Sequence, residues 1–242
     1  VAVDAAGYFY ALVNKPGTDF LRSDDRGKTW SSLRQGLPTT SFSTLMVDGQ
    51  GEIFVGTHGA GLYSSTKQGE VWIDRTKEYL DKRITVVSSP TIGFLYAGTY
   101  GGVFRSTDSC ETWQPTTLRD MLVVSLLPLG VGEIYAGTKD GGMFFSADSG
   151  STWMKTSFPS PNVTSMKVDN RGTIFAGTKS EGIYSSEDKG QTWRQANKGL
   201  TSMYILGLWK TRNGKILAAT FGGGIFQISP PGKNQMSTPG KK

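Results

Sequence analysis

Five tryptophans recur along the chain at an almost constant interval. Each one closes a variant of the same octapeptide, and successive tryptophans lie 42, 41, 40 and 40 residues apart: Trp30, Trp72, Trp113, Trp153 and Trp193. A self-similar unit of about 40 residues is typical of stacked or radial repeat architectures. One such unit cannot bury its apolar face alone, so the interval predicts that neighbouring units pack against each other in an array.

The fifth unit shows the expected strands most clearly. Short runs rich in Val, Ile, Phe, Tyr and Thr are bounded by Gly, Asn and Asp, which is the pattern of strands joined by tight turns. The runs lie at Val163–Asp169, Thr173–Thr178, Ile183–Ser186 and Thr192–Gln195. No segment keeps a helical period. Four antiparallel strands in 40 residues describe one blade, so we predict an all-β protein, a β-propeller of about six four-stranded antiparallel blades.

The blade boundaries follow from the alignment on the tryptophans. We expect a single propeller domain over 1–229, with blades near 1–36, 41–78, 82–118, 121–157, 161–198 and 203–229. The last blade is expected to be incomplete, because prolines follow its third strand and supply no ladder donors. Residues 230–242 read as a flexible basic tail. A seven- or eight-bladed parent cut to this length is the main alternative.

Composition excludes several functional classes. One cysteine, Cys110, rules out an internal disulfide and a cysteine-rich metal site, and one histidine, His58, rules out a multi-histidine metal centre. The net charge of +6 fits an ordinary solvated surface, so we expect no nucleic-acid partner. No apolar run is long enough to span a membrane. The chain starts at Val1 without a basic, apolar leader, which fits a mature or trimmed form of a longer protein or a part of a complex.

The octapeptide has a clear turn chemistry. An aspartate can accept hydrogen bonds from nearby amides, a glycine can take a positive φ, and the indole can pack against the neighbouring blade. The pattern S-x-D-x-G-x-T-W is intact in three copies and altered in two, where Cys110 replaces the glycine and where Lys67 and Val71 replace the aspartate and threonine. The intact copies are Ser23–Trp30, Ser146–Trp153 and Ser186–Trp193, and the altered ones are Ser106–Trp113 and Ser65–Trp72.

This pattern resembles the Asp-box, also called the bacterial neuraminidase (BNR) repeat, and the copies cover nearly the whole chain. Similar repeats occur in sialidases, the sortilin ectodomain, xyloglucan-cleaving hydrolases, photosystem II assembly factors and bacterial secreted or sensory propellers. The resemblance implies a propeller in which the box itself is a structural turn without chemistry. It also implies an extracytoplasmic location, periplasmic or secreted.

Candidate binding residues lie on the face formed by the hairpins and the blade-to-blade crossovers. These loops vary more than the turns of the opposite face, and variable residues on a rigid framework are how scaffolds usually bind ligands. The candidates are His58, Arg83, Tyr100, Arg119, Lys139, Asp140, Lys179, Glu181, Tyr204 and Phe221. The hairpin at Lys15–Gly17 belongs to the same face. Aromatic residues beside charges of both signs favour a protein or glycan ligand.

The sequence also allows an enzyme to be considered. The resemblance to sialidases would require three arginines for the substrate carboxylate, a tyrosine–glutamate nucleophile pair and a separate acid. Only Arg83 and Arg119 lie on the expected face, and Arg83-Ile84-Thr85 matches the family's Arg-Ile-Pro signature only in part. We therefore expect a non-enzymatic binding, scaffold or sensory module without cofactor or metal. The alternative is a glycoside hydrolase with an incomplete active site.

Overall fold

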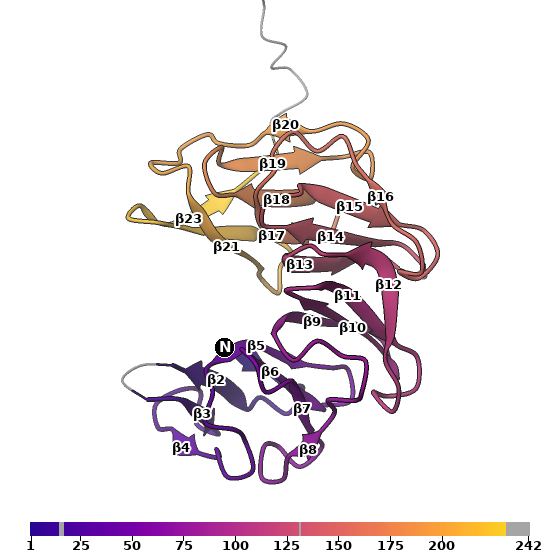
Figure 1. Cartoon of the computed structure of the whole chain (residues 1–242). Coiled ribbons are helices and arrows are strands. Elements are labelled where there is room, and N and C mark those ends of the chain that lie inside the picture. Colours follow the sequence, from indigo (N-terminus) through magenta and orange to yellow (C-terminus); the bar gives the residue numbers. More distant parts are fainter. Residues whose placement is uncertain (15–16, 131, 231–242) are drawn as a thin grey trace, which may run out of the picture. The chain divides into compact units, whose positions relative to one another are not determined.

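The computed structural model describes residues 1–14, 17–130 and 132–230, and within these ranges every regular element is a strand. The strands form six separate antiparallel sheets, which we call blades 1 to 6 in chain order. Each sheet is a simple meander, so strands that follow one another in sequence are hydrogen-bonded neighbours (Figure 1). The predicted fold class, an all-β propeller of about six blades, is confirmed.

The first three blades have four strands each. They are blade 1 with β1 (Ala2–Val3), β2 (Phe9–Val13), β3 (Asp19–Ser23) and β4 (Ser31–Ser32), blade 2 with β5 (Phe42–Val47), β6 (Ile53–Thr57), β7 (Leu62–Ser65) and β8 (Ile73–Asp74), and blade 3 with β9 (Ile84–Thr91), β10 (Phe94–Thr99), β11 (Gly102–Ser106) and β12 (Gln114–Arg119).

The remaining blades have four, four and three described strands. They are blade 4 with β13 (Val123–Pro128), β14 (Ile134–Thr138), β15 (Met143–Ser146) and β16 (Met154–Lys155), blade 5 with β17 (Val163–Val168), β18 (Ile174–Thr178), β19 (Ile183–Ser186) and β20 (Arg194–Gln195), and blade 6 with β21 (Ile205–Lys210), β22 (Ile216–Thr220) and β23 (Gly224–Ile228).

The predicted strands and the observed ones agree closely in blade 5, and blade 6 has three strands within the described ranges, as expected. The main difference is the outer strand of blade 5, which was predicted to start at Thr192 but starts at Arg194. Thr192 is held in the preceding turn because its hydroxyl and its amide both donate to Asp188. Of the expected flexible tail, residues 230–242, all but Pro230 lie outside the described residues, as do residues 15–16 of the Lys15–Gly17 hairpin.

The octapeptide forms the same hydrogen-bonded turn in each of the four blades that carry its aspartate. In blade 5 the Ser186 hydroxyl donates to Asp188 (2.7 Å), the amide of Thr192 donates to Asp188 (2.9 Å), and the amide of Gly190 donates to the Ser186 hydroxyl (2.7 Å). The fourth and fifth positions both have positive φ, with Lys189 at 54° and Gly190 at 75°. Cys110 occupies the fifth position in blade 3 at φ 67°, so a side chain is carried there in a conformation that favours glycine.

Consecutive blades pack through alternate residues of their second strands. In β6, Ile53 and Val55 belong to the cluster shared with blade 1, whereas Phe54 belongs to the cluster shared with blade 3. This alternation follows from the two-residue period of a strand. A glycine near the end of the second strand lets the next blade approach: a Cβ on Gly177 would lie 2.6 Å from Cγ2 of Ile205.

The five tryptophans do not have equivalent environments, which corrects the expectation that each indole fills a seam between blades. Trp113 is 2% exposed and donates from Nε1 to the Arg75 carbonyl of blade 2 (3.1 Å). Trp72 donates in the same way to Leu33 of blade 1 (3.1 Å). Trp153 and Trp193 donate instead to the glycine carbonyl of their own turns, although both rings also contact apolar residues outside them. Trp30 is 38% exposed and donates to the Gly27 carbonyl of its own turn (3.1 Å).

The chain divides into two compact units. Unit 1 comprises Val1–Ala136 and Phe144–Met154, and unit 2 comprises Gly137–Met143 and Lys155–Lys242. Blades 1 to 3 therefore belong to unit 1, and blades 5 and 6 to unit 2. Within the described ranges there is no helix of the length and apolar character needed to cross a bilayer.

Candidate functional site

A buried threonine at the end of each second strand of blades 2 to 6 shapes the hairpin that follows. In blade 2 the hydroxyl of Thr57 donates to the carbonyl of Gly61 (2.9 Å) and accepts from the amide of Ala60 (2.9 Å). The residue directly after the threonine is thereby presented at the tip of the hairpin. These residues are His58, Tyr100, Lys139, Lys179 and Phe221, all of them candidates from the sequence.

Backbone hydrogen bonds join each hairpin to a neighbouring crossover. The amides of Gly59 and Gly61 donate to the carbonyl of Lys82 (3.1 and 3.0 Å), and the amide of Tyr100 donates to the carbonyl of Arg83 (3.2 Å). Arg83 therefore lies between the hairpins of blades 2 and 3, and it also forms an isolated β-bridge with His58. Three candidates that are distant in sequence come together because the crossover is tied on both sides.

The exposed side chains of His58, Arg83 and Tyr100 and the partly buried Asp81 form one group, which we call the loop cluster. The Arg83 guanidinium lies over the Tyr100 ring, 5.1 Å from its centroid. The His58 ring meets Tyr100 edge-on, with centroids 6.5 Å apart and an interplanar angle of 87°. Tyr100 remains 42% exposed. The cluster is a cation and two rings held at the surface of unit 1.

Asp81 fixes the position of Arg83. Its carboxylate accepts from Nε (3.2 Å) and Nη2 (3.1 Å) of Arg83 and from the Arg83 amide (2.9 Å). Hydrogen bonding to Asp81 raises the pKa of Arg83 above its ordinary value. The candidate residues from the sequence do not include Asp81. Its separation of two residues from Arg83, within a short crossover, was the available signal.

Arg119 lies near this cluster through the backbone of blade 3. It is the last residue of β12 and pairs with Gly102, and the amide of the following Asp120 donates to the carbonyl of Gly101 (3.0 Å). Its Nε donates to the carbonyl of Thr116 (3.0 Å), so its guanidinium is anchored within its own strand.

Unit 2 repeats the arrangement with different side chains. Tyr204, in the crossover into blade 6, stacks on Phe221 with centroids 5.6 Å apart, and the Phe221 amide donates to the Tyr204 carbonyl (2.9 Å). In blade 5, Lys179 is exposed and Glu181 accepts from the Tyr184 hydroxyl (2.7 Å).

Lys139 and the adjacent Asp140 form the tip of the blade 4 hairpin. The Asn162 amide, in the orientation that satisfies its contacts, donates to both of them. The candidates of unit 2 thus form local pairs at successive hairpins.

Several titratable side chains in the described ranges are already paired or buried. The Asp81 carboxylate is engaged by Arg83, and the Glu181 carboxylate accepts from the Tyr184 hydroxyl. No group of three or more His, Cys, Asp or Glu side chains in the described ranges is placed to hold a metal ion. Cys110 is buried, and burial raises the pKa of its thiol to about 12, which leaves almost no thiolate at neutral pH.

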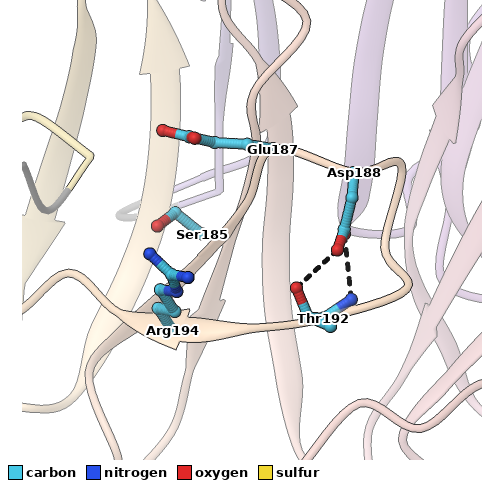
Figure 2. A pocket seen from close by; sticks show the side chains of 5 residues that line it. All are labelled: Ser185, Glu187, Asp188, Thr192 and Arg194. Atoms are coloured by element: carbon cyan, nitrogen blue, oxygen red, sulfur yellow. Dashed lines mark hydrogen bonds between the residues drawn. The ribbon is translucent and has the colours of Figure 1, made fainter. Parts of the chain in front are cut away.

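A hollow also lies beside the octapeptide turn of blade 5, and we call it the blade 5 socket. Ser185, Glu187, Asp188, Thr192 and Arg194 line it. Figure 2 shows Arg194 and Ser185 on one side of it, and on the other Asp188 bound to Thr192 within the turn. None of the candidate residues from the sequence lies in this hollow.

Comparison with known proteins assigns the fold. No family model matches the chain, and no curated protein matches its sequence. Among solved structures, the extracellular domain of the hybrid two-component system BT4673 from B. thetaiotaomicron is similar with a TM-score of 0.74 and 22% identity, over 92% of this chain and 31% of that one.

Two further structures illustrate the range of similar proteins. YCF48 bound to D1 peptide matches with a TM-score of 0.70 and 17% identity, over 93% of this chain and 75% of that one. The GH74 xyloglucanase from Xanthomonas campestris matches with a TM-score of 0.70 and 18% identity, over 92% of this chain and 43% of that one. The chain spans about a third of the length of the BT4673 domain. These similarities establish the propeller fold, and the similar proteins include the extracellular domain of a two-component system, a protein bound to a peptide and a GH74 xyloglucanase.

Proposed function

We propose that this protein is a non-enzymatic binding module that recognises a protein or an extracellular polymer through its loop face. The observation that carries the proposal is the loop cluster, in which Asp81 and two hairpins hold Arg83 and Tyr100 in a defined, exposed arrangement. Ordering these side chains before a ligand arrives lowers the entropy lost on binding.

The cluster has the chemistry of a recognition site. Arg83 uses Nε and Nη2 for Asp81, while its Nη1 has no hydrogen-bond acceptor among the described residues and can donate to a ligand carbonyl, carboxylate or hydroxyl group. The adjacent Tyr100 offers an amphipathic ring, and tyrosine and arginine are enriched among residues that dominate binding energies. His58 closes one edge of this surface.

The similar structures support a module of this kind. One is the extracellular domain of a two-component system and another is bound to a peptide. We extend the proposal to location and place the protein outside the cytoplasm, as a bacterial secreted, periplasmic or sensory propeller. Fractionation of the native host with an antibody against the chain tests this, and a cytoplasmic signal would refute it.

The test of the function is binding to defined libraries. The chain is applied to a peptide array and a glycan array, and the best ligand is titrated against Tyr100→Ala and Arg83→Ala. Each change is expected to weaken binding by at least about tenfold, since a charge-assisted hydrogen bond or an aromatic contact at this surface is lost. Lys28→Ala, an exposed lysine in the octapeptide turn of blade 1, is the matched control and is expected to bind like the wild type.

Two results would overturn the proposal. Binding that is unchanged in both cluster variants would place recognition elsewhere on the molecule. Hydrolysis of fluorogenic glycosides, including a sialoside, above a no-protein control would make the chain an enzyme. Peptide and glycan arrays together also decide which kind of ligand the loop face prefers.

A further inference from the structure

The blade 5 socket corresponds to a place that is filled in other blades. Phe175 of β18 packs with Ile216 and Ala218 of blade 6, so its side of the sheet faces blade 6. Phe175 pairs with Ser185, and Ser185 pairs with Arg194. Because residues paired across antiparallel strands share a face, Arg194 is also on the side toward blade 6.

An arginine on this same side braces the next octapeptide turn in blades 1, 2 and 3. Arg22 contacts Glu70 (3.4 Å) in the turn of blade 2, and Arg75 contacts Glu111 (2.9 Å) in the turn of blade 3. Arg105 donates to the hydroxyl of Ser151 in the turn of blade 4. These three partners occupy the sixth position of their octapeptides. Arg194 is placed to brace a turn of blade 6 in the same way.

A second hollow lies where the tryptophan of such a turn would be buried. It is a groove between blades 5 and 6 whose apolar lining includes Phe175, Ile216 and Ile228. The equivalents of Phe175 and Ile216 at the junction of blades 2 and 3 are Phe54 and Leu95, which pack in one cluster with Trp113. The described part of blade 6 supplies no such indole. Its third strand, β23, has no partner along its outer edge in the described ranges, and Ile225 is 73% exposed.

The sequence after Ile228 does not suit this turn. The pairing of Ile216 with Ile228 makes Ile228 the counterpart of the first serine of the octapeptide. Pro231 then falls on the fourth position, which has φ between 54° and 65° in all five turns, whereas proline is restricted to a φ near −65°. Lys233 falls on the sixth position, where two turns carry a glutamate against the arginine. Residues 228–233 therefore lack the sequence features that form this turn in the other blades.

We propose that the outer edge of blade 6 accepts a strand from a partner protein by β-strand addition. The partner segment carries a glutamate that enters the blade 5 socket and pairs with Arg194. Two residues later it carries an aromatic residue that fills the groove over Phe175, and it then runs along β23 as an antiparallel strand. The spacing is that of Glu70, Trp72 and Ile73 in this chain. Main-chain hydrogen bonds provide affinity in this mode, and side-chain pockets provide specificity.

The probe is a fluorescein-labelled synthetic peptide with the sequence of residues 66–76 of this chain, TKQGEVWIDRT. Fluorescence anisotropy measures its binding to the full chain. The Arg194→Glu variant is expected to bind this peptide at least about tenfold more weakly than the wild type. It is also expected to bind a second peptide, in which lysine replaces the glutamate, more tightly than the wild type does, because the charges across the contact are then exchanged. Lys198→Glu, the same charge reversal on an exposed residue of unit 2, is expected to leave the affinity within about twofold.

Hydrogen exchange locates the bound strand. Peptide binding is expected to slow exchange in residues 224–228, because the free edge of β23 becomes hydrogen-bonded. Failure of the peptide to bind at about 1 mM, or equal affinity for the glutamate and lysine peptides, would overturn the proposal. Self-association of the chain that the peptide displaces would assign the edge to a second copy and would also refute it. The loop cluster is not involved, so the outcome is independent of the proposed function.

Discussion

Replacing Trp113 with alanine tests whether the recurring indoles hold the blades together. Trp113 is 2% exposed and packs in one cluster with Phe54 and Leu95 of the two adjoining blades. Burying an indole removes about 150–250 Å² from water, which corresponds to a gross gain of about 4–6 kcal/mol. Truncation also leaves the Arg75 carbonyl without its donor. We expect Trp113→Ala to lower the free energy of unfolding by about 3–5 kcal/mol, as is common for large-to-small changes in a core.

The chain supplies its own control, because Trp30 has the same place in its octapeptide but a different environment. It is 38% exposed and donates to Gly27 of its own turn, so Trp30→Ala is expected to cost about 1 kcal/mol or less. Both variants are measured by urea denaturation, with far-UV circular dichroism and tryptophan fluorescence followed together. Equal losses in the two variants, or a loss below about 1.5 kcal/mol for Trp113→Ala, would refute the reasoning, since burial between blades would then not decide the energy.

Three further predictions concern single groups. Hydrogen bonds from the hydroxyl and then the amide of Thr192 lower the pKa of Asp188 to about 2, below its value in the unfolded chain, so its stabilising effect is present above about pH 4 and lost as the pH falls toward 2. The free energy of unfolding of Asp188→Asn, measured with urea, should therefore depend less steeply on pH in that window than that of the wild type. Equal slopes for the two proteins would contradict this prediction. The buried Cys110 thiol, whose pKa is raised to about 12, should not react with a disulfide reagent at pH 8 until denaturant unfolds the chain, and rapid labelling of the native protein would contradict its burial. Gly177→Ala should lower the unfolding free energy by about 1–3 kcal/mol, because its Cβ would meet Ile205. A Cβ at Gly49 would have no atom within 4 Å, so Gly49→Ala should change the unfolding free energy by no more than about 0.5 kcal/mol. Equal losses of the two variants in thermal unfolding would exclude the close approach at Gly177.

The sequence predicted the strands well because their signals are local. Gly, Asp and Asn mark the turns, and the fixed interval places each strand relative to the next tryptophan, so the boundaries in blade 5 agree to within two residues. The environment of each indole, unlike the strand boundaries, is not set by local sequence. Whether Trp30 or Trp113 is buried depends on the preceding blade and not on its own octapeptide, and identical motifs cannot reveal it.

The loop cluster could be predicted as residues but not as an arrangement. His58, Arg83 and Tyr100 were all candidates, yet their proximity depends on the backbone hydrogen bonds that tie one crossover to two hairpins. A positional rule would have found this arrangement. The residue that follows the threonine at the end of a second strand lies beside the residue that precedes the first strand of the next blade. Asp81 was missed because its role is to orient Arg83, and the signal for that role was its position two residues before Arg83 in the same short crossover.

Three of the arginines share a structural role, which separates them from the candidate binding residues. Arg22, Arg75 and Arg105 each hold the octapeptide turn of the following blade, so their charge is used within unit 1. Arg83 differs, because the carboxylate that holds it comes from its own crossover and leaves its Nη1 without an acceptor among the described residues. An arginine whose guanidinium is bonded to a neighbouring blade adds little to ligand recognition, whereas one fixed beside an exposed ring retains donors for a ligand. The loop cluster is therefore favoured by its geometry and not by a general excess of basic residues.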